Sequence, residues 1–149
     1  MRILPAAGAF IALVSSAQAM DLNSYRAQNG RAPLRMDYSL SGLANFHAAS
    51  LARRGALDHA GFKTERAPLG ANAENVSYGC ADEDCAIKQW ARSGPHRANM
   101  LRKDVTTYGL ASVTAANGRR YWVMELGGAA PVIRVQRARK PYMESATRR

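Results

Sequence analysis

The chain has 149 residues, with 21 Lys and Arg against 11 Asp and Glu, and a formal net charge of +10. This length suits one domain and excludes a multidomain enzyme or a full α/β barrel, which needs roughly 250 residues. A hydrophobic content of 47% argues against wholesale disorder. The positive charge points to an acidic partner, either nucleic acid or an anionic membrane surface, so its distribution along the chain matters.

Residues 1–19 have the pattern of an export signal. Met1–Arg2 is a short positive region, Ile3–Val14 is apolar, and Ala17-Gln18-Ala19 is a cleavage motif. The apolar run is too short for a membrane-spanning helix, which needs roughly 20 residues. We expect cleavage after Ala19 and a soluble mature chain that starts at Met20 and is exported to the periplasm or the medium.

Two cysteines, Cys80 and Cys85, are present, with four residues between them. A pair this close in an exported protein indicates a disulfide. A zinc finger would need two further ligands downstream, where only His96 occurs. The sequence therefore predicts a disulfide that fixes a short loop.

The first half of the mature chain predicts two helices joined by an extended connector. The first helix covers Asp21–Gln28, with Asp21 as its cap, and the connector is Pro33–Asp37. The second helix begins at a cap on Ser39 or Ser41 and runs to Arg54, where Gly55 ends it. One face of this helix carries a stripe that must pack on something: Leu40, Leu43, Ala44, His47, Leu51 and Arg54.

The second half predicts a loop, three short helices and a hairpin. The loop is Ala56–Ala73, and the helices are Ala73–Tyr78, Asp84–Ser93 with Ile87 and Trp90 buried, and His96–Arg102 after Gly94-Pro95. Two alternating segments, Thr106–Thr114 and Arg119–Leu126, flank an Asn117-Gly118 turn. Helices packed on a small antiparallel sheet make an α+β domain.

The segment 132–149 is a basic tail, with six basic residues and one acidic residue. The tail therefore carries most of the positive charge, and the domain at 20–131 is only mildly basic. We expect no nucleic-acid partner, and we expect the tail either to contact an anionic membrane or to be a solvated extension.

The chain has three histidines, His47, His59 and His96. His47 lies on the apolar helix stripe, where a packed histidine is the simpler interpretation. His59 follows a helix end, and His96 begins a helix after a break. With Glu74 between them, these two imidazoles could hold a divalent metal with open coordination positions. No G-x-S-x-G motif or phosphate-binding glycine loop is present.

The order of several motifs resembles the CAP superfamily of cysteine-rich secretory, antigen 5 and pathogenesis-related 1 proteins, in particular its compact bacterial SCP-domain members. The likeness runs from about Leu22 to Gly128. The motifs that carry it are Asn23-Ser24-Tyr25-Arg26, Pro33-Leu34, Asp58-His59, Ala73-Glu74-Asn75-Val76, Trp90, the stretch Ser93-Gly94-Pro95-His96-Arg97-Ala98-Asn99-Met100-Leu101, Tyr108-Gly109 and Tyr121-Trp122. The resemblance implies an α-β-α sandwich, in which helices flank a three-stranded antiparallel sheet.

The resemblance also implies a central cleft lined by two histidines and two acidic residues. His59, Glu74 and His96 match three of these positions, while Ser93 stands where eukaryotic members have the second glutamate. Around the three ligand candidates, the supporting residues would be His47, Ser93, Arg97 and Asn99.

The resemblance constrains the site more than the reaction. We expect a monomeric, non-catalytic binding protein whose cleft takes a divalent metal such as zinc, a lipid or an envelope component. The alternative is a metal-dependent peptidase or esterase. In that enzyme His59 and His96 would hold zinc, and Glu74 would be the general base.

Overall fold

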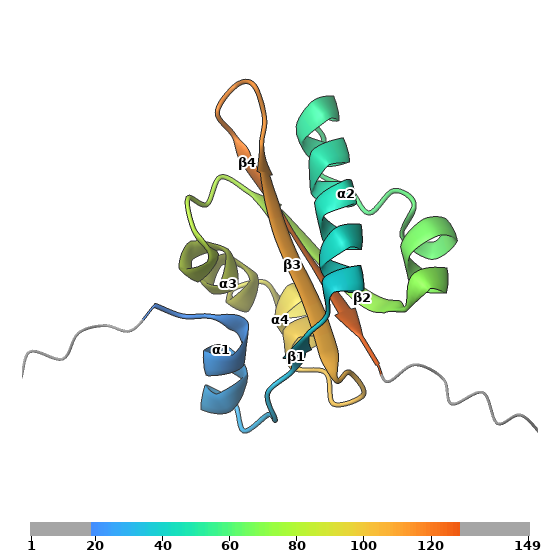
Figure 1. The fold of residues 1–149 in the computed structure, drawn as a ribbon. Helices are drawn as coiled ribbons and strands as arrows, with labels where there is room; N and C mark the ends of the chain where they lie inside the picture. Colours follow the sequence, from blue (N-terminus) through green and yellow to red (C-terminus); the bar gives the residue numbers. More distant parts are fainter. Residues whose placement is uncertain (1–18, 129–149) are drawn as a thin grey trace, which may run out of the picture.

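The computed structural model describes residues 19–128, which form one sheet between two layers of helices (Figure 1). Residues 1–18 of the predicted signal and the whole predicted tail, 132–149, lie outside the described residues. The elements, in chain order, are α1 (Leu22–Gln28), β1 (Arg35–Met36), α2 (Tyr38–Arg54), η1 (Phe62–Arg66), η2 (Ala67–Leu69), β2 (Ala71–Tyr78), α3 (Glu83–Ala91), α4 (Gly94–Met100), β3 (Thr107–Thr114) and β4 (Arg120–Gly127).

The sheet has the strand order β1-β3-β4-β2. The predicted hairpin is confirmed as β3 and β4, and β2 pairs antiparallel with β4. These three strands are the antiparallel sheet that the sequence led us to expect. The fourth strand, β1, has two residues and pairs parallel with β3, because the connector passes close enough for Arg35 N–H to donate to the carbonyl of Thr106 at 3.0 Å.

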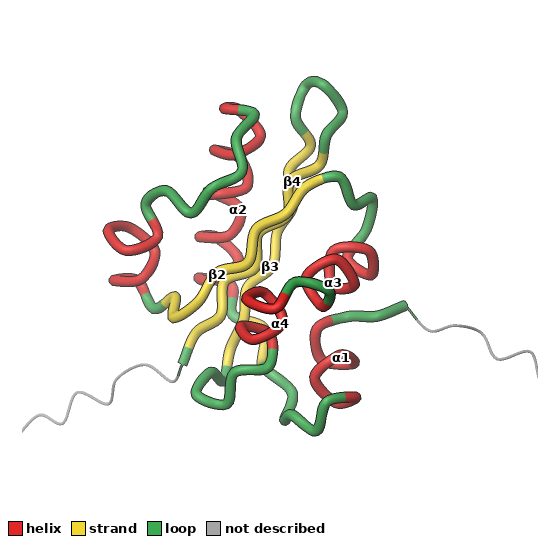
Figure 2. Tube along the Cα trace, turned by 180° about the vertical axis from the view of Figure 1, so that it is seen from behind, coloured by secondary structure: helices red, strands yellow, loops and turns green. Residues whose placement is uncertain are grey.

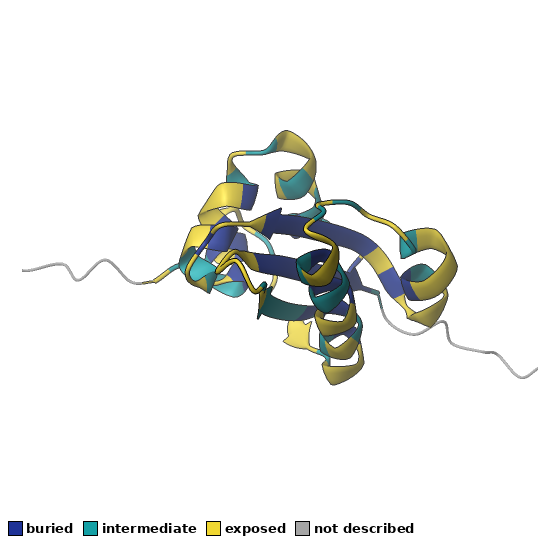
Figure 3. Ribbon diagram, turned by 90° about the horizontal axis from the view of Figure 1, so that it is seen from above, coloured by how far each residue is buried: buried dark blue, intermediate teal, exposed yellow. Residues whose placement is uncertain are grey.

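Each face of the sheet is covered by its own helices. Helix α2 lies on one face, and α1, α3 and α4 lie on the other, which is visible when the views of Figures 1 and 2 are compared. Tyr121 and Val123 of β4 pack under α2, whereas Trp122, Met124 and Leu126 pack against the other layer. β4 is therefore buried on both sides (Figure 3), and every one of its residues after Arg120 is in the interior.

The structure contradicts one predicted helix. Residues 73–78 belong to strand β2 and pair with β4 from Glu74↔Glu125 to Tyr78↔Tyr121. The local sequence begins with alanines and allows a helical turn, but pairing with a buried neighbouring strand decides the conformation. The correction matters because it places Glu74 on the sheet and not on a helix.

Smaller differences concern α2 and the loop after it. The N-cap is Asp37, whose carboxylate accepts from the N–H groups of Ser39 and Leu40, so neither predicted serine caps the helix. Leu40, Ala44, His47 and Leu51 of the predicted stripe are buried, but Leu43 is half-buried and Arg54 is exposed. The predicted loop 56–73 contains the short turns η1 and η2.

Gly109 of β3 is the point where α2 comes closest to the sheet. A Cβ atom at this position would clash with the backbone of Leu40 and Ser41, so only glycine permits this helix-to-sheet distance. Gly109 faces Glu125, which in turn pairs with Glu74, so these three residues form one row across the sheet under the N-terminal half of α2.

We predict opposite effects for two glycine substitutions. Gly109→Ala should lower the free energy of unfolding by about 3 kcal/mol or more, because the added methyl group has no space. Gly42→Ala, at an uncrowded position of α2, should raise it by about 0.5–1 kcal/mol. Urea unfolding followed by circular dichroism measures both values, and a neutral Gly109→Ala variant would contradict the close approach described here.

Candidate functional site

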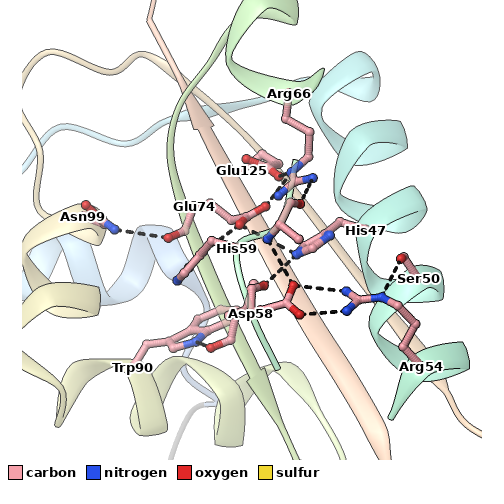
Figure 4. Close-up of polar contacts among 12 residues, drawn as sticks. His47, Ser50, Arg54, Asp58, His59, Arg66, Glu74, Trp90, Asn99 and Glu125 are labelled. Atoms are coloured by element: carbon pink, nitrogen blue, oxygen red, sulfur yellow. Dashed lines mark hydrogen bonds and ion pairs between the residues drawn. The ribbon is translucent and has the colours of Figure 1, made fainter. Parts of the chain in front are cut away.

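His59 lies in the loop after α2, and its neighbour Asp58 fixes that loop. The Asp58 carboxylate forms a bidentate ion pair with Arg54, with N···O distances of 2.7 and 3.0 Å, and accepts from the N–H of Ala60 at 3.0 Å. The carbonyl of Asp58 accepts from Nε2 of His47 at 2.9 Å. These contacts, drawn in Figure 4, set the loop so that the His59 side chain points toward β2.

His47 is buried under the sheet and does not line the cleft. Burial lowers the pKa of its imidazole, so the ring is neutral at pH 7. Because a carbonyl oxygen only accepts, the bond to Asp58 assigns the proton to Nε2. Its Nε2 also lies 3.8 Å from Oε1 of Glu74. His47 therefore links α2 to the loop that carries His59, and its expected supporting role at the site stays a prediction.

Glu74 and His59 are brought together as the sequence predicts. Nδ1 of His59 lies 2.7 Å from Oε1 of Glu74 (Figure 4). The imidazole is 52% exposed, whereas the carboxylate is 1% exposed. A buried carboxylate that accepts from Nδ1 fixes the orientation of the ring and leaves Nε2 as its free nitrogen.

Arg66 and Glu125 belong to the same cluster, and the sequence did not reveal either. Nε of Arg66 donates to Oε2 of Glu74 at 2.7 Å and lies 3.0 Å from Oε1 of Glu125. All three side chains are at most 1% exposed. The sequence did contain one indication of Glu125. It is the only ionisable residue in the otherwise apolar run Trp122–Leu126 of β4, and an ionisable side chain within a buried strand needs a partner.

The two buried carboxyls differ in protonation. Burial raises the pKa of Glu74, but its contacts with Glu125, Arg66 and His59 outweigh this effect and hold the value below the ordinary range. Burial and the adjacent Glu74 raise the pKa of Glu125 to about 10, so Glu125 is protonated at pH 7. The cluster thus combines one carboxylate, one neutral carboxylic acid and one guanidinium, and its charges balance.

His96 approaches the cleft from α4, and two asparagines hold that helix on β2. Nδ2 of Asn75 donates to the carbonyl of His96 at 3.0 Å. Nδ2 of Asn99 donates to Oδ1 of Asn75 at 2.9 Å and to the carbonyl of Glu74 at 3.2 Å. Burial and the nearby charge of His59 lower the pKa of His96, so its imidazole is neutral at pH 7. The expected supporting role of Asn99 has a geometric basis in these bonds.

Of the two remaining supporting candidates, Ser93 lines a cavity next to His96, whereas Arg97 points to solvent. Ser93 caps α4 without a side-chain hydrogen bond and lines a cavity of about 280 Å³ that His96 also lines. The Arg97 side chain is exposed, and it forms no hydrogen bond or ion pair within residues 19–128. Its expected contribution to the orientation of His96 remains a prediction.

The predicted disulfide is confirmed, since Cys80 and Cys85 are bonded. It joins the end of β2 to the first turn of α3. Nε1 of Trp122 donates to the carbonyl of Cys80 at 2.9 Å, which ties the same loop to β4.

Among residues 19–128, no group of three or more His, Cys, Asp and Glu side chains is arranged to hold a metal ion. Both oxygens of Glu74 already accept hydrogen bonds, from His59 and from Arg66. The donors that fit a metal are therefore two imidazole nitrogens, Nε2 of His59 and one on the ring of His96, with Glu74 behind the first of them. Within the same described residues, no helix combines the length and the apolar character that crossing a bilayer requires.

The comparisons with known proteins show the family and the fold. The sequence profile of the cysteine-rich secretory protein family, CAP, matches residues 21–126. The comparison with curated proteins found no match. The fold is similar to that of an outer surface protein from Borrelia burgdorferi, with a TM-score of 0.60 and 18% identity over 72% of this chain and 86% of that one.

A second similar structure is an extracellular protein from Bacillus anthracis that contains an SCP domain, with a TM-score of 0.55 and 17% identity. The match covers 72% of this chain but only 37% of that protein, so the chain spans little more than a third of its length. At these identities the two structures establish the fold and nothing about the ligand.

We predict that Glu125→Gln changes how stability depends on pH. The folded protein keeps Glu125 protonated up to about pH 10, whereas the unfolded chain ionises it near the ordinary value, so wild-type stability falls as the pH rises between these limits. The amide cannot ionise. The variant should therefore gain on wild type by up to about 1.4 kcal/mol per pH unit between about pH 5 and about pH 8.

Urea unfolding over this pH range measures the difference. Glu65→Gln is the matched control, because Glu65 is exposed and should leave the pH profile unchanged. Parallel profiles for wild type and Glu125→Gln would contradict a protonated Glu125.

Proposed function

Because the chain belongs to the cysteine-rich secretory protein (CAP) family, we propose that it is an exported, non-catalytic binding protein whose cleft holds a divalent metal ion through His59 and His96. The observation that carries this proposal is the 2.7 Å contact between Nδ1 of His59 and the buried carboxylate of Glu74. An imidazole oriented in this way by a carboxylate is the usual arrangement behind a metal-binding histidine.

The state of His96 supports the same proposal. Its lowered pKa keeps the ring neutral at pH 7, and only a neutral imidazole donates an electron pair to a metal. A zinc ion bound to two imidazoles would retain open positions for water or for an anionic group of a ligand.

The geometry supports binding over hydrolysis. A metal-dependent hydrolase would use Glu74 as its general base, but Glu74 is 1% exposed and both of its oxygens are occupied by His59 and Arg66. A base must reach the proton that it removes. Glu74 is better suited to hold His59 in place, and Ser93 supplies no second carboxylate.

We predict that zinc binding depends on the two histidines and, to a lesser degree, on Glu74. In calorimetric titrations, His59→Ala and His96→Ala should each abolish measurable binding. Glu74→Gln should weaken it by about 10–100-fold, because the ring of His59 loses its orienting carboxylate. The control is Arg53→Ala, an exposed position on α2. Equal zinc affinity in wild type and both histidine variants would overturn the proposed metal site.

Export gives a separate prediction. When the full chain is expressed in a bacterial host, the protein recovered from the periplasm or medium should begin at Met20, because the signal ends with Ala17-Gln18-Ala19. Intact-mass spectrometry measures the N-terminus. Ala19→Leu should block cleavage, and a recovered wild-type protein that retains residues 1–19 would contradict the signal assignment.

A further inference from the structure

A groove runs from His96 along the open edge of β2 to the disulfide. It consists of two adjoining cavities that share Tyr78 and Gln89. The first, of about 280 Å³, is lined by Leu57, Val76, Ser77, Trp90, Ser93 and His96 in addition to the shared pair. The second, of about 470 Å³, is lined by Gly79, Cys80, Asp84, Cys85, Lys88 and Arg92 in addition to the shared pair.

The first cavity is mainly apolar, although it opens to solvent. Leu57 and Tyr78 are large apolar side chains that remain 44% and 41% exposed at its rim, and Trp90 forms its inner wall. Ser77 also lines it, and the buried hydroxyl of Ser77 has no hydrogen-bond partner in the described part of the chain. A volume of about 280 Å³ accepts one large apolar side chain, and the serine hydroxyl can bond to a polar group beside it.

The second cavity carries an uncompensated positive charge. Lys88 is paired with Asp84 at 2.6 Å, and Asp84 is the only acidic residue in its lining. Arg92 also lines this cavity, and it has no ion-pair partner within residues 19–128. An exposed guanidinium of this kind pairs well with a carboxylate.

The edge of β2 excludes one way of binding a peptide. An edge strand normally offers its outward carbonyls to an added strand. Here the carbonyl of Val76 accepts from Nε1 of Trp90 at 3.2 Å, and the carbonyl of Glu74 accepts from Asn99 at 3.2 Å. These two carbonyls are therefore not free for an added strand, and we expect side chains to hold a ligand in the groove. Figure 4 shows Trp90 and Asn99 at this edge, on either side of His59.

We propose that this groove binds a short acidic peptide segment, with a large apolar residue in the cavity beside His96 and a neighbouring carboxylate on Arg92. The inference rests on the proposed function only in that His96, a proposed metal ligand, also lines the first cavity. The series of polar groups along the groove, Ser77, Gln89 and Ser93, favours a peptide over an alkyl chain, which would leave these groups without partners.

The test uses two pools of fluorescein-labelled hexapeptides. The acidic pool has Glu followed by Leu or Phe at the two central positions and mixed residues around them, and the basic pool has Lys in place of Glu. Fluorescence anisotropy is measured with the full mature chain, once in a chelator and once with zinc. The acidic pool should bind at least about tenfold more tightly than the basic pool. Equal binding of the two pools, or binding of neither, would overturn the proposal.

Three variants locate the binding on the groove. Arg92→Glu should weaken binding of the acidic pool at least about tenfold, and Leu57→Ser at least about threefold. Arg53→Glu, a charge reversal outside the groove, is the matched control and should have no effect. Since all three side chains reach the solvent, the variants should fold. Loss of affinity with Arg53→Glu equal to that with Arg92→Glu would show non-specific attraction and overturn the proposal.

The failures of the two proposals are distinguishable. Arg92→Glu should keep the zinc affinity of wild type, because Arg92 is not a candidate ligand. Zinc binding without peptide binding overturns the peptide groove alone, and peptide binding in chelator without zinc binding overturns the metal site alone. If decanoate raises the thermal midpoint while neither pool binds, the groove is a lipid site, which also overturns the peptide proposal.

Discussion

The guanidinium of Arg66 between two buried carboxyls is the interaction on which the site depends. It lies under α2, holds Glu74 as a carboxylate and stands beside a protonated Glu125. A buried charge without a partner costs several kcal/mol, so removing Arg66 or Glu74 would leave the other uncompensated. Because Glu74 is fixed by Arg66, it can in turn fix His59, and an exposed imidazole obtains its direction from a cluster in the interior.

The sheet explains why segments far apart in sequence meet at one place. β2 is an edge strand, so the loop after α2 reaches it from one face and α4 reaches it from the other. Each of the two histidines is positioned by hydrogen bonds to a neighbouring pair of β2 residues, Glu74 and Asn75. β2 thus positions the segments on both sides of the cleft. Glu74 fixes the ring of His59, and Asn75 fixes the backbone of His96.

Much of the fold could be predicted from local patterns, and the site could be predicted only in part. The Asp21 cap of α1, the hairpin and the disulfide follow from short-range chemistry that the sequence displays. The conformation of residues 73–78 does not, because it depends on pairing with β4, about 50 residues further along the chain. Arg66 and Glu125 were missed for the same reason. Neither stands in a motif. Their roles arise only when the sheet places Glu125 beside Glu74 and η1 brings Arg66 to both carboxyls.

The two side chains that occupy the edge carbonyls of β2 also limit how far the sheet can extend. At one edge, Trp90 and Asn99 already satisfy the outward carbonyls of Val76 and Glu74. At the other edge, β1 has only two residues. It pairs only with Thr107 and Tyr108, so the rest of β3, as far as Thr114, has no neighbouring strand on that side. The two edges of the sheet therefore differ, and any strand added from outside the domain should join β3 and not β2.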